Sequence, residues 1–109
     1  MHKDARIYVA GHTGLLGSAL VRKLKTDDYR NIITKTHKEL DLTNQQSVND
    51  FFLKEQPEYI FLAAGLVGGI MANKTSPYTF LHTNISIQDN VFEAATKTDV
   101  KLLMDLLYE

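Results

Sequence analysis

Short apolar runs alternate with segments of helical periodicity along most of this chain. The run Arg6–Ala10 is rich in apolar and β-forming residues and ends at a glycine, which predicts a buried strand. Leucine and alanine then recur every three or four positions, which predicts an amphipathic helix that ends before Asp27. Its apolar positions, which we expect to pack inward, are Leu15, Leu16, Ala19, Leu20 and Leu24.

The same alternation continues in the middle of the sequence. Residues 31–36 have the composition of a second strand. Thr43 and Gln46 form a Thr-x-x-Gln capping box, which predicts that a helix begins there with Thr43 as its cap. Pro57 cannot continue that helix. Its inward positions are expected to be Val48, Phe51 and Phe52.

The last part of the chain repeats the pattern with a longer helix. Residues 59–64 are almost entirely apolar, as expected for a strand covered on both faces of a sheet. Ser76 and Pro77 have the order of a cap followed by the first helical residue. Residues 100–107 fit a fourth strand or more helix. The inward stripe of the long helix is expected to be Phe80, Leu81, Asn84, Ile85, Gln88, Val91, Phe92 and Ala95.

Regular alternation of strands and helices predicts an α/β fold. We expect a Rossmann-like, doubly wound parallel sheet with three to four strands, helices on both faces and right-handed crossovers. The expected strand order is 3-2-1-4 if the last strand forms. Residues 1–109 are expected to be a single, partial dinucleotide-binding domain, since no linker or repeat divides them.

Composition narrows the possible functions. The 109 residues are 44% apolar and carry a net charge of −1, which gives no electrostatic reason to expect nucleic acid or a membrane as partner. There is no cysteine, which excludes thiolate metal ligands and a cysteine nucleophile. The four histidines have no metal-ligand spacing, and we expect no metal site. Without a predicted leader or membrane span, the expected location is the cytoplasm.

The strongest chemical signal is a glycine triplet between the first predicted strand and helix. Gly11 permits a tight turn, Gly14 lets a pyrophosphate approach the backbone, and Gly17 permits close packing of helix on sheet. The helix N-terminus adds unpaired N–H groups and a partial positive charge. No Gly-Lys-Ser or Gly-Lys-Thr occurs, so a nucleotide-triphosphate P-loop is excluded. The triplet therefore predicts a dinucleotide site.

The residues after the second strand bear on the choice between NADP and NAD. NAD sites usually have an acidic residue about 20 positions after the glycines, to bind the ribose 2′-hydroxyl. Lys35, His37 and Lys38 lie there instead, which favours the 2′-phosphate of NADP. Glu39 is the nearest acid and keeps NAD as the less favoured alternative.

Several segments together have a familiar form. They are Val9–Ala19, Lys38–Thr43, Leu62–Ala64, Val67–Ile70 and Ala72–Asn73. The sequence closely resembles the GDP-L-fucose synthases, a family of the extended short-chain dehydrogenase/reductase superfamily, over about residues 4–103. The resemblance implies an NADP-dependent enzyme that converts GDP-4-keto-6-deoxy-mannose to GDP-fucose by epimerisation and reduction.

The resemblance also implies roles for individual residues. The pyrophosphate loop would be Gly11, Thr13, Gly14, Leu15, Leu16 and Gly17. His37, with Lys35 nearby, matches the position of the 2′-phosphate cation, and Asp41 and Leu42 match the pair beside the adenine. The segment whose backbone passes along the cofactor would be Ala63, Ala64 and Gly65.

Catalytic residues of that superfamily are not found in this sequence. None of the five tyrosines is followed four positions later by lysine, and the family's cysteine is lacking. We expect no redox or epimerase chemistry from this chain alone, and GDP-sugar binding only when the missing part is supplied. The alternatives are a non-catalytic NAD(P)-binding or sensing module, or a fragment of another nucleotide-sugar epimerase/dehydratase.

Two expectations concern the long helix. Asn84 and Asn90 lie on its apolar stripe, and a buried amide that fixes a neighbouring strand is preferred to a catalytic role. In the resembling family the corresponding helices pair across a dimer interface, so a homodimer through residues 76–95 is expected as one possible assembly.

Overall fold

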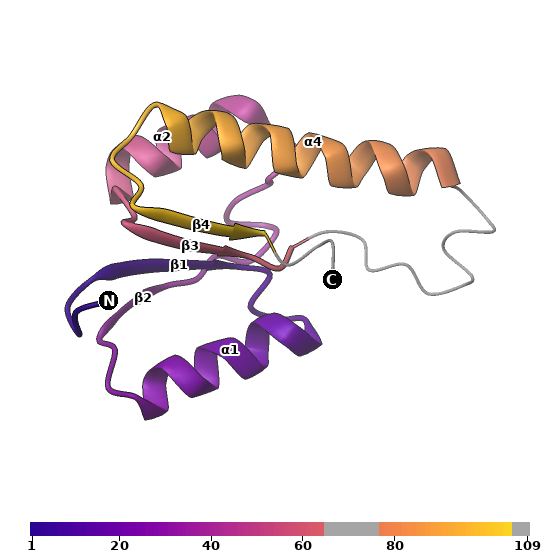
Figure 1. Cartoon of the computed structure of the whole chain (residues 1–109). Helices are drawn as coiled ribbons and strands as arrows, with labels where there is room; N and C mark the ends of the chain where they lie inside the picture. Colours follow the sequence, from indigo (N-terminus) through magenta and orange to yellow (C-terminus); the bar gives the residue numbers. More distant parts are fainter. Residues whose placement is uncertain (65–76, 106–109) are drawn as a thin grey trace.

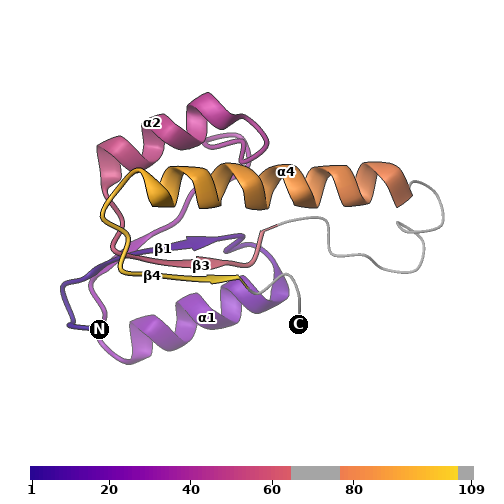
Figure 2. The same ribbon diagram turned by 45° about the horizontal axis from the view of Figure 1, so that its top comes forward.

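A computed structural model of the chain describes residues 1–64 and 77–105. Its strands form one parallel, four-stranded sheet, and its helices cover both faces (Figure 1). Helix α1 lies against one face, and α2 and α4 lie side by side on the other (Figure 2). The predicted Rossmann-like α/β fold is confirmed. The elements are β1 (Arg6–Ala10), α1 (Leu15–Thr26), β2 (Asn31–Ile33), α2 (Gln45–Glu55), β3 (Tyr59–Leu62), α4 (Pro77–Thr96) and β4 (Leu102–Asp105).

The strand order is β2-β1-β3-β4, so the predicted order 3-2-1-4 is wrong. The reason lies in the face on which α2 packs. Right-handed crossovers through helices on opposite faces move in opposite directions across a sheet. Since α1 and α2 cover opposite faces, the chain moves outward from β1 to β2 and then returns past β1 to β3 (Figure 1).

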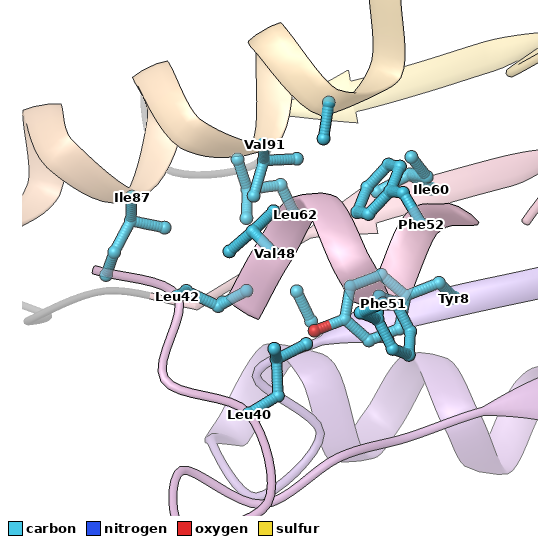
Figure 3. Close-up of a cluster of buried hydrophobic side chains, with 12 residues drawn as sticks. Tyr8, Leu40, Leu42, Val48, Phe51, Phe52, Ile60, Leu62, Ile87 and Val91 are labelled. Atoms are coloured by element: carbon cyan, nitrogen blue, oxygen red, sulfur yellow. The ribbon is translucent and has the colours of Figure 1, made fainter. Parts of the chain in front are cut away.

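Alternation along β1 divides the core into two clusters. Tyr8 and Ala10 point to the α2 and α4 side, where they join Phe52 and Val91 (Figure 3). Ile7 and Val9 point to the α1 side. The larger cluster contains an aromatic group in which the ring centroids of Tyr8 and Phe51 lie 4.6 Å apart. The predicted inward positions of α2 are confirmed: Val48, Phe51 and Phe52 are buried.

The buried face of α1 differs from the predicted one. Leu15 is 90% exposed, and Leu16 and Ala19 are also exposed. The face toward the sheet begins instead at Gly17, whose missing side chain brings α1 close to β1. From that glycine, helical spacing turns Val21 and Leu24 inward along with Leu20.

The inward stripe of α4 is also shifted from the prediction. Leu81, Ile85 and Phe92 are exposed. The buried positions are Ile87, Asn90, Val91 and Ala94, which follow the helical spacing of one face. The predicted cap at Ser76 lies outside the described residues, and α4 begins at Pro77 as expected.

The start of α2 is capped by a different residue from the predicted one. The side chain of Asn44, not Thr43, accepts the hydrogen bond from the backbone N–H of Ser47. The hydroxyl of Thr43 instead donates to Asp41 Oδ1 at 2.6 Å, within the turn that precedes the helix. The helix ends at Glu55, two residues before Pro57 as expected.

The strand ends also differ in detail from the expectation. β2 and β3 are shorter than predicted, and residues 102–105 form the fourth strand rather than a helix. Within the described ranges, no helix combines the length and hydrophobicity needed to cross a bilayer.

Candidate functional site

A cavity of about 310 Å³ opens at the carboxyl ends of β1 and β3. From β1 the chain crosses to β2 at one edge of the sheet, and from β3 it crosses to β4 at the other edge. Open α/β sheets bind their ligands at such switch points, where the strand order reverses. Its walls come from the loop after β1, the loop between β2 and α2, the end of β3, and α4. The lining residues are Tyr8, Gly11, His12, Thr13, Gly14, Lys35, Thr36, His37, Leu40, Asp41, Leu42, Thr43, Ala63, Ala64, Thr83 and Ile87.

The floor of the cavity is bare main chain. Gly11 has a φ of +89°, which an L side chain rarely adopts, and a Cβ built on it would lie 2.7 Å from the backbone nitrogen of Ala64. A Cβ on Gly17 would overlap the carbonyl oxygen of Gly11. These two positions therefore accept only glycine, and together they hold α1 tightly under the loop.

The N-terminus of α1 lies directly beside this floor. Its N-cap residue is Gly14, which has no side chain to accept from the first-turn N–H groups, and no acidic residue occupies that turn. The first intrahelical hydrogen bond runs from the N–H of Ser18 to the carbonyl of Gly14. Helix geometry leaves the N–H groups of residues 15–17 without intrahelical partners, and the helix dipole adds positive charge there. This end of α1 is suited to bind an anion.

The loop between β2 and α2 brings basic residues to the same cavity. Lys35 and His37 line it, and His12 lines it from the loop after β1. Lys38 is exposed and does not line it. The cationic side of the cavity is therefore assembled from two loops that are far apart in the sequence.

The nearby carboxylates are engaged within their own turns. Glu39 accepts from the backbone N–H of Thr36 at 2.9 Å, and this bond is the main cause that holds the pKa of Glu39 below its usual value. Asp41 accepts from the hydroxyl and the backbone N–H of Thr43, which lower the pKa of its carboxyl. Glu39 was the residue that kept NAD as an alternative in the sequence. It does not line the cavity, and its carboxylate caps the turn at Thr36 instead.

Helix α4 closes the far wall and fixes the loop that faces it. Thr83 and Ile87 line the cavity. Asn90 is only 7% exposed, and its side-chain amide donates to the carbonyl oxygen of Leu42 at 3.0 Å. The amide is thus buried as expected, but it fixes the cavity loop rather than a strand.

Most of the residues predicted for the site meet at this cavity. Those that line it are Gly11, Thr13, Gly14, Lys35, His37, Asp41, Leu42, Ala63 and Ala64. Leu15 and Leu16 do not line the cavity but contribute backbone at the start of α1, and Gly17 packs against the backbone of Gly11. Gly65 lies outside the described residues.

The remaining lining residues were not predicted. They are Tyr8, His12, Thr36, Leu40, Thr43, Thr83 and Ile87. His12 and Thr36 are sequence neighbours of predicted residues, so adjacency to the glycine triplet and to His37 was an available signal. Thr83 and Ile87 had none, because they reach the cavity only through the packing of α4.

Comparison with known proteins agrees with this geometry. The sequence matches the NAD dependent epimerase/dehydratase family over residues 7–107. It is 52% identical to GDP-L-fucose synthase 1 of Arabidopsis thaliana over 104 residues, which are 95% of this chain and 32% of the relative. It is 40% identical to GDP-L-fucose synthase of Escherichia coli over 101 residues, which are 93% of this chain and 32% of that enzyme.

Solved structures give the same result. The GDP-mannoheptose C4 reductase MlghC of Campylobacter jejuni, solved with NADP bound, superposes with a TM-score of 0.92 at 43% identity, over 96% of this chain and 31% of that one. A GDP-L-fucose synthetase from Naegleria fowleri, bound to NADP, has a TM-score of 0.82 at 25% identity, over 96% of this chain and 32% of that one.

The chain spans about a third of the length of the curated relatives that it matches, and it corresponds to their N-terminal portion. The glycine floor, the uncapped helix end and the switch-point cavity all lie within the matched segment. On this evidence the chain belongs to the NAD dependent epimerase/dehydratase family.

Proposed function

We propose that this chain supplies the NADP-binding part of an enzyme that epimerises and reduces GDP-4-keto-6-deoxy-mannose, as expected of a GDP-L-fucose synthase. One observation carries the proposal. The cavity floor is main chain at Gly11, where any Cβ would collide with the end of β3, and it adjoins the free N–H groups of α1. A pyrophosphate needs this combination of close backbone approach and positive potential.

The choice of NADP over NAD is supported by the loop after β2. Lys35 and His37 line the cavity at the place where an NAD site would have an acid, and Glu39 is engaged by Thr36. Two similar proteins, from Campylobacter jejuni and Naegleria fowleri, are described with NADP bound. Neutralising a 2′-phosphate requires cations, which this loop provides.

The domain assignment is part of the same proposal. Residues 1–109 form a single dinucleotide-binding domain, and the catalytic and substrate-binding groups are supplied from outside it. The superfamily's Tyr-x-x-x-Lys pair is absent from this sequence, so a proton donor for the keto group must come from elsewhere. The GDP-sugar is bound only when that other part is present.

Assembly and location complete the proposal. Exposed apolar residues on α4, among them Leu81, Ile85 and Phe92, support a homodimer through this helix. The cytoplasm stays the predicted location. The alternative of a sensing module without chemistry has no observation that favours it over the enzyme.

The first test is a calorimetric titration of the purified chain with NADP⁺ and NAD⁺. We expect NADP⁺ to bind with a dissociation constant on the order of micromolar or lower, and NAD⁺ to bind more weakly. Equal or tighter binding of NAD⁺ would refute the assignment of the cationic loop.

The second test addresses the reaction. In a chimera, residues 4–103 replace the matching segment of the Escherichia coli enzyme, and turnover of GDP-4-keto-6-deoxy-mannose is measured. We expect activity in the chimera and none in the same chimera with Gly11→Val. A folded chimera that binds NADP⁺ but is inactive would limit the chain to cofactor binding.

A further inference from the structure

We propose that the buried hydroxyl of Tyr8 binds the adenine ring of the cofactor, as a hydrogen-bond donor that the folded protein leaves for its ligand. The inference rests on the proposed function, because it requires a dinucleotide in the cavity. It adds to that site a specificity-determining residue that no sequence motif marks. Three observations carry it: the burial of Tyr8, its place in the cavity wall, and the lack of a partner for its hydroxyl among the described residues.

Two aromatic neighbours orient the side chain of Tyr8. Only 1% of the residue is exposed, and its ring centroid lies 4.6 Å from that of Phe51 and 6.4 Å from that of Phe52. In Figure 3 the hydroxyl oxygen points away from β1 and toward Leu40, which also lines the cavity. The packing of the ring therefore fixes the direction of the hydroxyl before any ligand arrives.

The hydroxyl of Tyr8 is unpaired within residues 1–64 and 77–105. Buried polar side-chain atoms are hydrogen-bonded in the large majority of cases, so an exception calls for an explanation. In these ranges, Asn49 Oδ1 is the one polar side-chain atom that is both unpaired and closed off from solvent. The Tyr8 oxygen is not closed off in this way, and the space that it can reach is the cavity.

An unpaired hydroxyl in this position has a cost for the protein alone. A buried polar group without a partner loses its hydration and gains nothing in return, whereas the ring of phenylalanine would fill the same space without that loss. Burial also raises the pKa of the Tyr8 phenol, so the group keeps its proton and can donate it in a hydrogen bond. A ligand with an acceptor at this point would recover the lost interaction.

The side chains that line the cavity with Tyr8 include an apolar group. Leu40, Leu42 and Ile87 are between 6% and 8% exposed. A flat heterocycle suits such a wall, because its faces pack on aliphatic side chains while a polar atom at its edge forms a hydrogen bond. A phosphate or a sugar would leave several polar groups without partners there. The wall around Tyr8 therefore favours a heterocyclic base.

Of the two rings in a dinucleotide, adenine is the one that we expect at this wall. Leu40 and Leu42 belong to the same loop as Lys35 and His37, where the 2′-phosphate is proposed to bind. The ribose that carries the 2′-phosphate also carries the adenine, so the two groups bind near each other. The Tyr8 hydroxyl would then donate to a ring nitrogen of the adenine.

The test is calorimetric titration of the full chain and of Tyr8→Phe with two ligands. They are NADP⁺ and adenosine 2′,5′-bisphosphate, which contains the adenosine part without the nicotinamide. Phenylalanine keeps the contacts with Phe51 and Phe52 and removes only the oxygen. We expect the dissociation constants of both ligands to rise by the same factor, about fivefold. Without ligand, the urea midpoint of Tyr8→Phe should equal or exceed that of the parent, because an unpaired polar group has left the core.

Tyr59→Phe is the matched control for the loss of a phenol oxygen. Tyr59 packs on the α1 side of the sheet and is not among the described residues that line the cavity. The variant should therefore bind NADP⁺ and the bisphosphate as the parent does. A loss of affinity equal to that of Tyr8→Phe would show that the effect is not specific to the cavity, and would overturn the inference.

The other outcomes separate this inference from the proposed function. If Tyr8→Phe binds NADP⁺ as tightly as the parent, or if the bisphosphate does not share the loss, the inference is wrong and the proposed function stands. A lower urea midpoint for Tyr8→Phe would also overturn it, since the hydroxyl would then stabilise the fold. If the parent binds neither ligand, the proposed function fails, and this inference fails with it.

Discussion

The backbones of Gly11 and Ala63 are in close contact at the floor of the cavity. A Cβ on Gly11 would lie 2.7 Å from the carbonyl carbon of Ala63. Since the φ of Gly11 is also positive, Gly11→Ala combines backbone strain with a collision. We expect a loss of about 2–4 kcal/mol in the free energy of unfolding and no detectable NADP⁺ binding. Urea denaturation and calorimetry measure the two effects. An unchanged unfolding midpoint would contradict the packing described here.

Gly14→Ala is predicted to separate binding from folding. A Cβ at this position would lie 3.6 Å from the carbonyl oxygen of Gly11, an ordinary contact, and the backbone of Gly14 has an extended conformation that alanine can adopt. Stability should change by no more than about 1 kcal/mol. Because Gly14 lines the cavity proposed for the pyrophosphate, a methyl group there should raise the dissociation constant for NADP⁺ roughly tenfold or more. Normal affinity in this variant would place the phosphates elsewhere.

Asn90→Leu tests the link between α4 and the cavity loop. The substitution keeps the branching of the side chain, with two larger methyl groups, and removes the donor to the carbonyl of Leu42, which would stay buried without a partner. We expect a loss of about 1–3 kcal/mol in unfolding free energy and weaker NADP⁺ binding. Replacement of the exposed neighbour Asp89 by Asn is the control and should alter neither quantity. Equal effects of the two substitutions would show that this hydrogen bond has no special role.

Glu58 predicts how stability responds to acid. Its carboxylate accepts from the backbone N–H of Arg6 and pairs with Lys101 at 3.0 Å, and these contacts lower its pKa to about 2. A carboxyl whose pKa falls on folding stabilises the native state above its unfolded pKa, and this contribution disappears as pH falls from about 4.5 to about 2. Glu58→Gln should therefore be less stable than the parent at pH 7.

The difference between Glu58→Gln and the parent should shrink steadily as the pH is lowered through that interval. Thermal unfolding at a series of pH values measures it. Glu55→Gln removes a carboxylate outside this cluster and serves as the control. A stability difference that stays constant down to the lowest pH would disprove the coupling.

The exposed stripe on α4 leads to a prediction about assembly. Leu81 and Ile85 lie one turn apart and are more than half exposed. If the chain dimerises through this helix, replacing both with lysine should raise the dimer dissociation constant roughly tenfold or more, as measured by sedimentation equilibrium. Ala19→Lys changes charge at an exposed position of α1, on the opposite face of the sheet, and should have little effect. A parent chain that is monomeric at high concentration would exclude this interface.

The elements themselves could be predicted because their signals are local. The apolar run of β1, the glycines after it and Pro57 after α2 each act within a few residues. The cavity residues next to Gly11 and His37 could be found for the same reason. In each case the cavity residues are close in sequence to the motif that identifies them.

The strand order and the α4 wall depend on packing between distant parts. The strand order follows from the face of the sheet that α2 covers. The hydrophobic pattern of an amphipathic helix does not specify which face of the sheet the helix covers. Thr83 reaches the cavity only because α4 lies beside α2. The cap of α2 is Asn44 rather than Thr43, whose hydroxyl donates to Asp41 in a loop conformation that periodicity does not reveal.

The walls of the cavity span the sequence from Tyr8 to Ile87. A dinucleotide in this position would contact four stretches of chain that are otherwise joined mainly through the hydrophobic interior. It would therefore link the beginning of the domain to α4 near its end. Its binding energy would then add directly to native-state stability, by mass action. In the cell, the supply of cofactor would govern how long such a small domain persists.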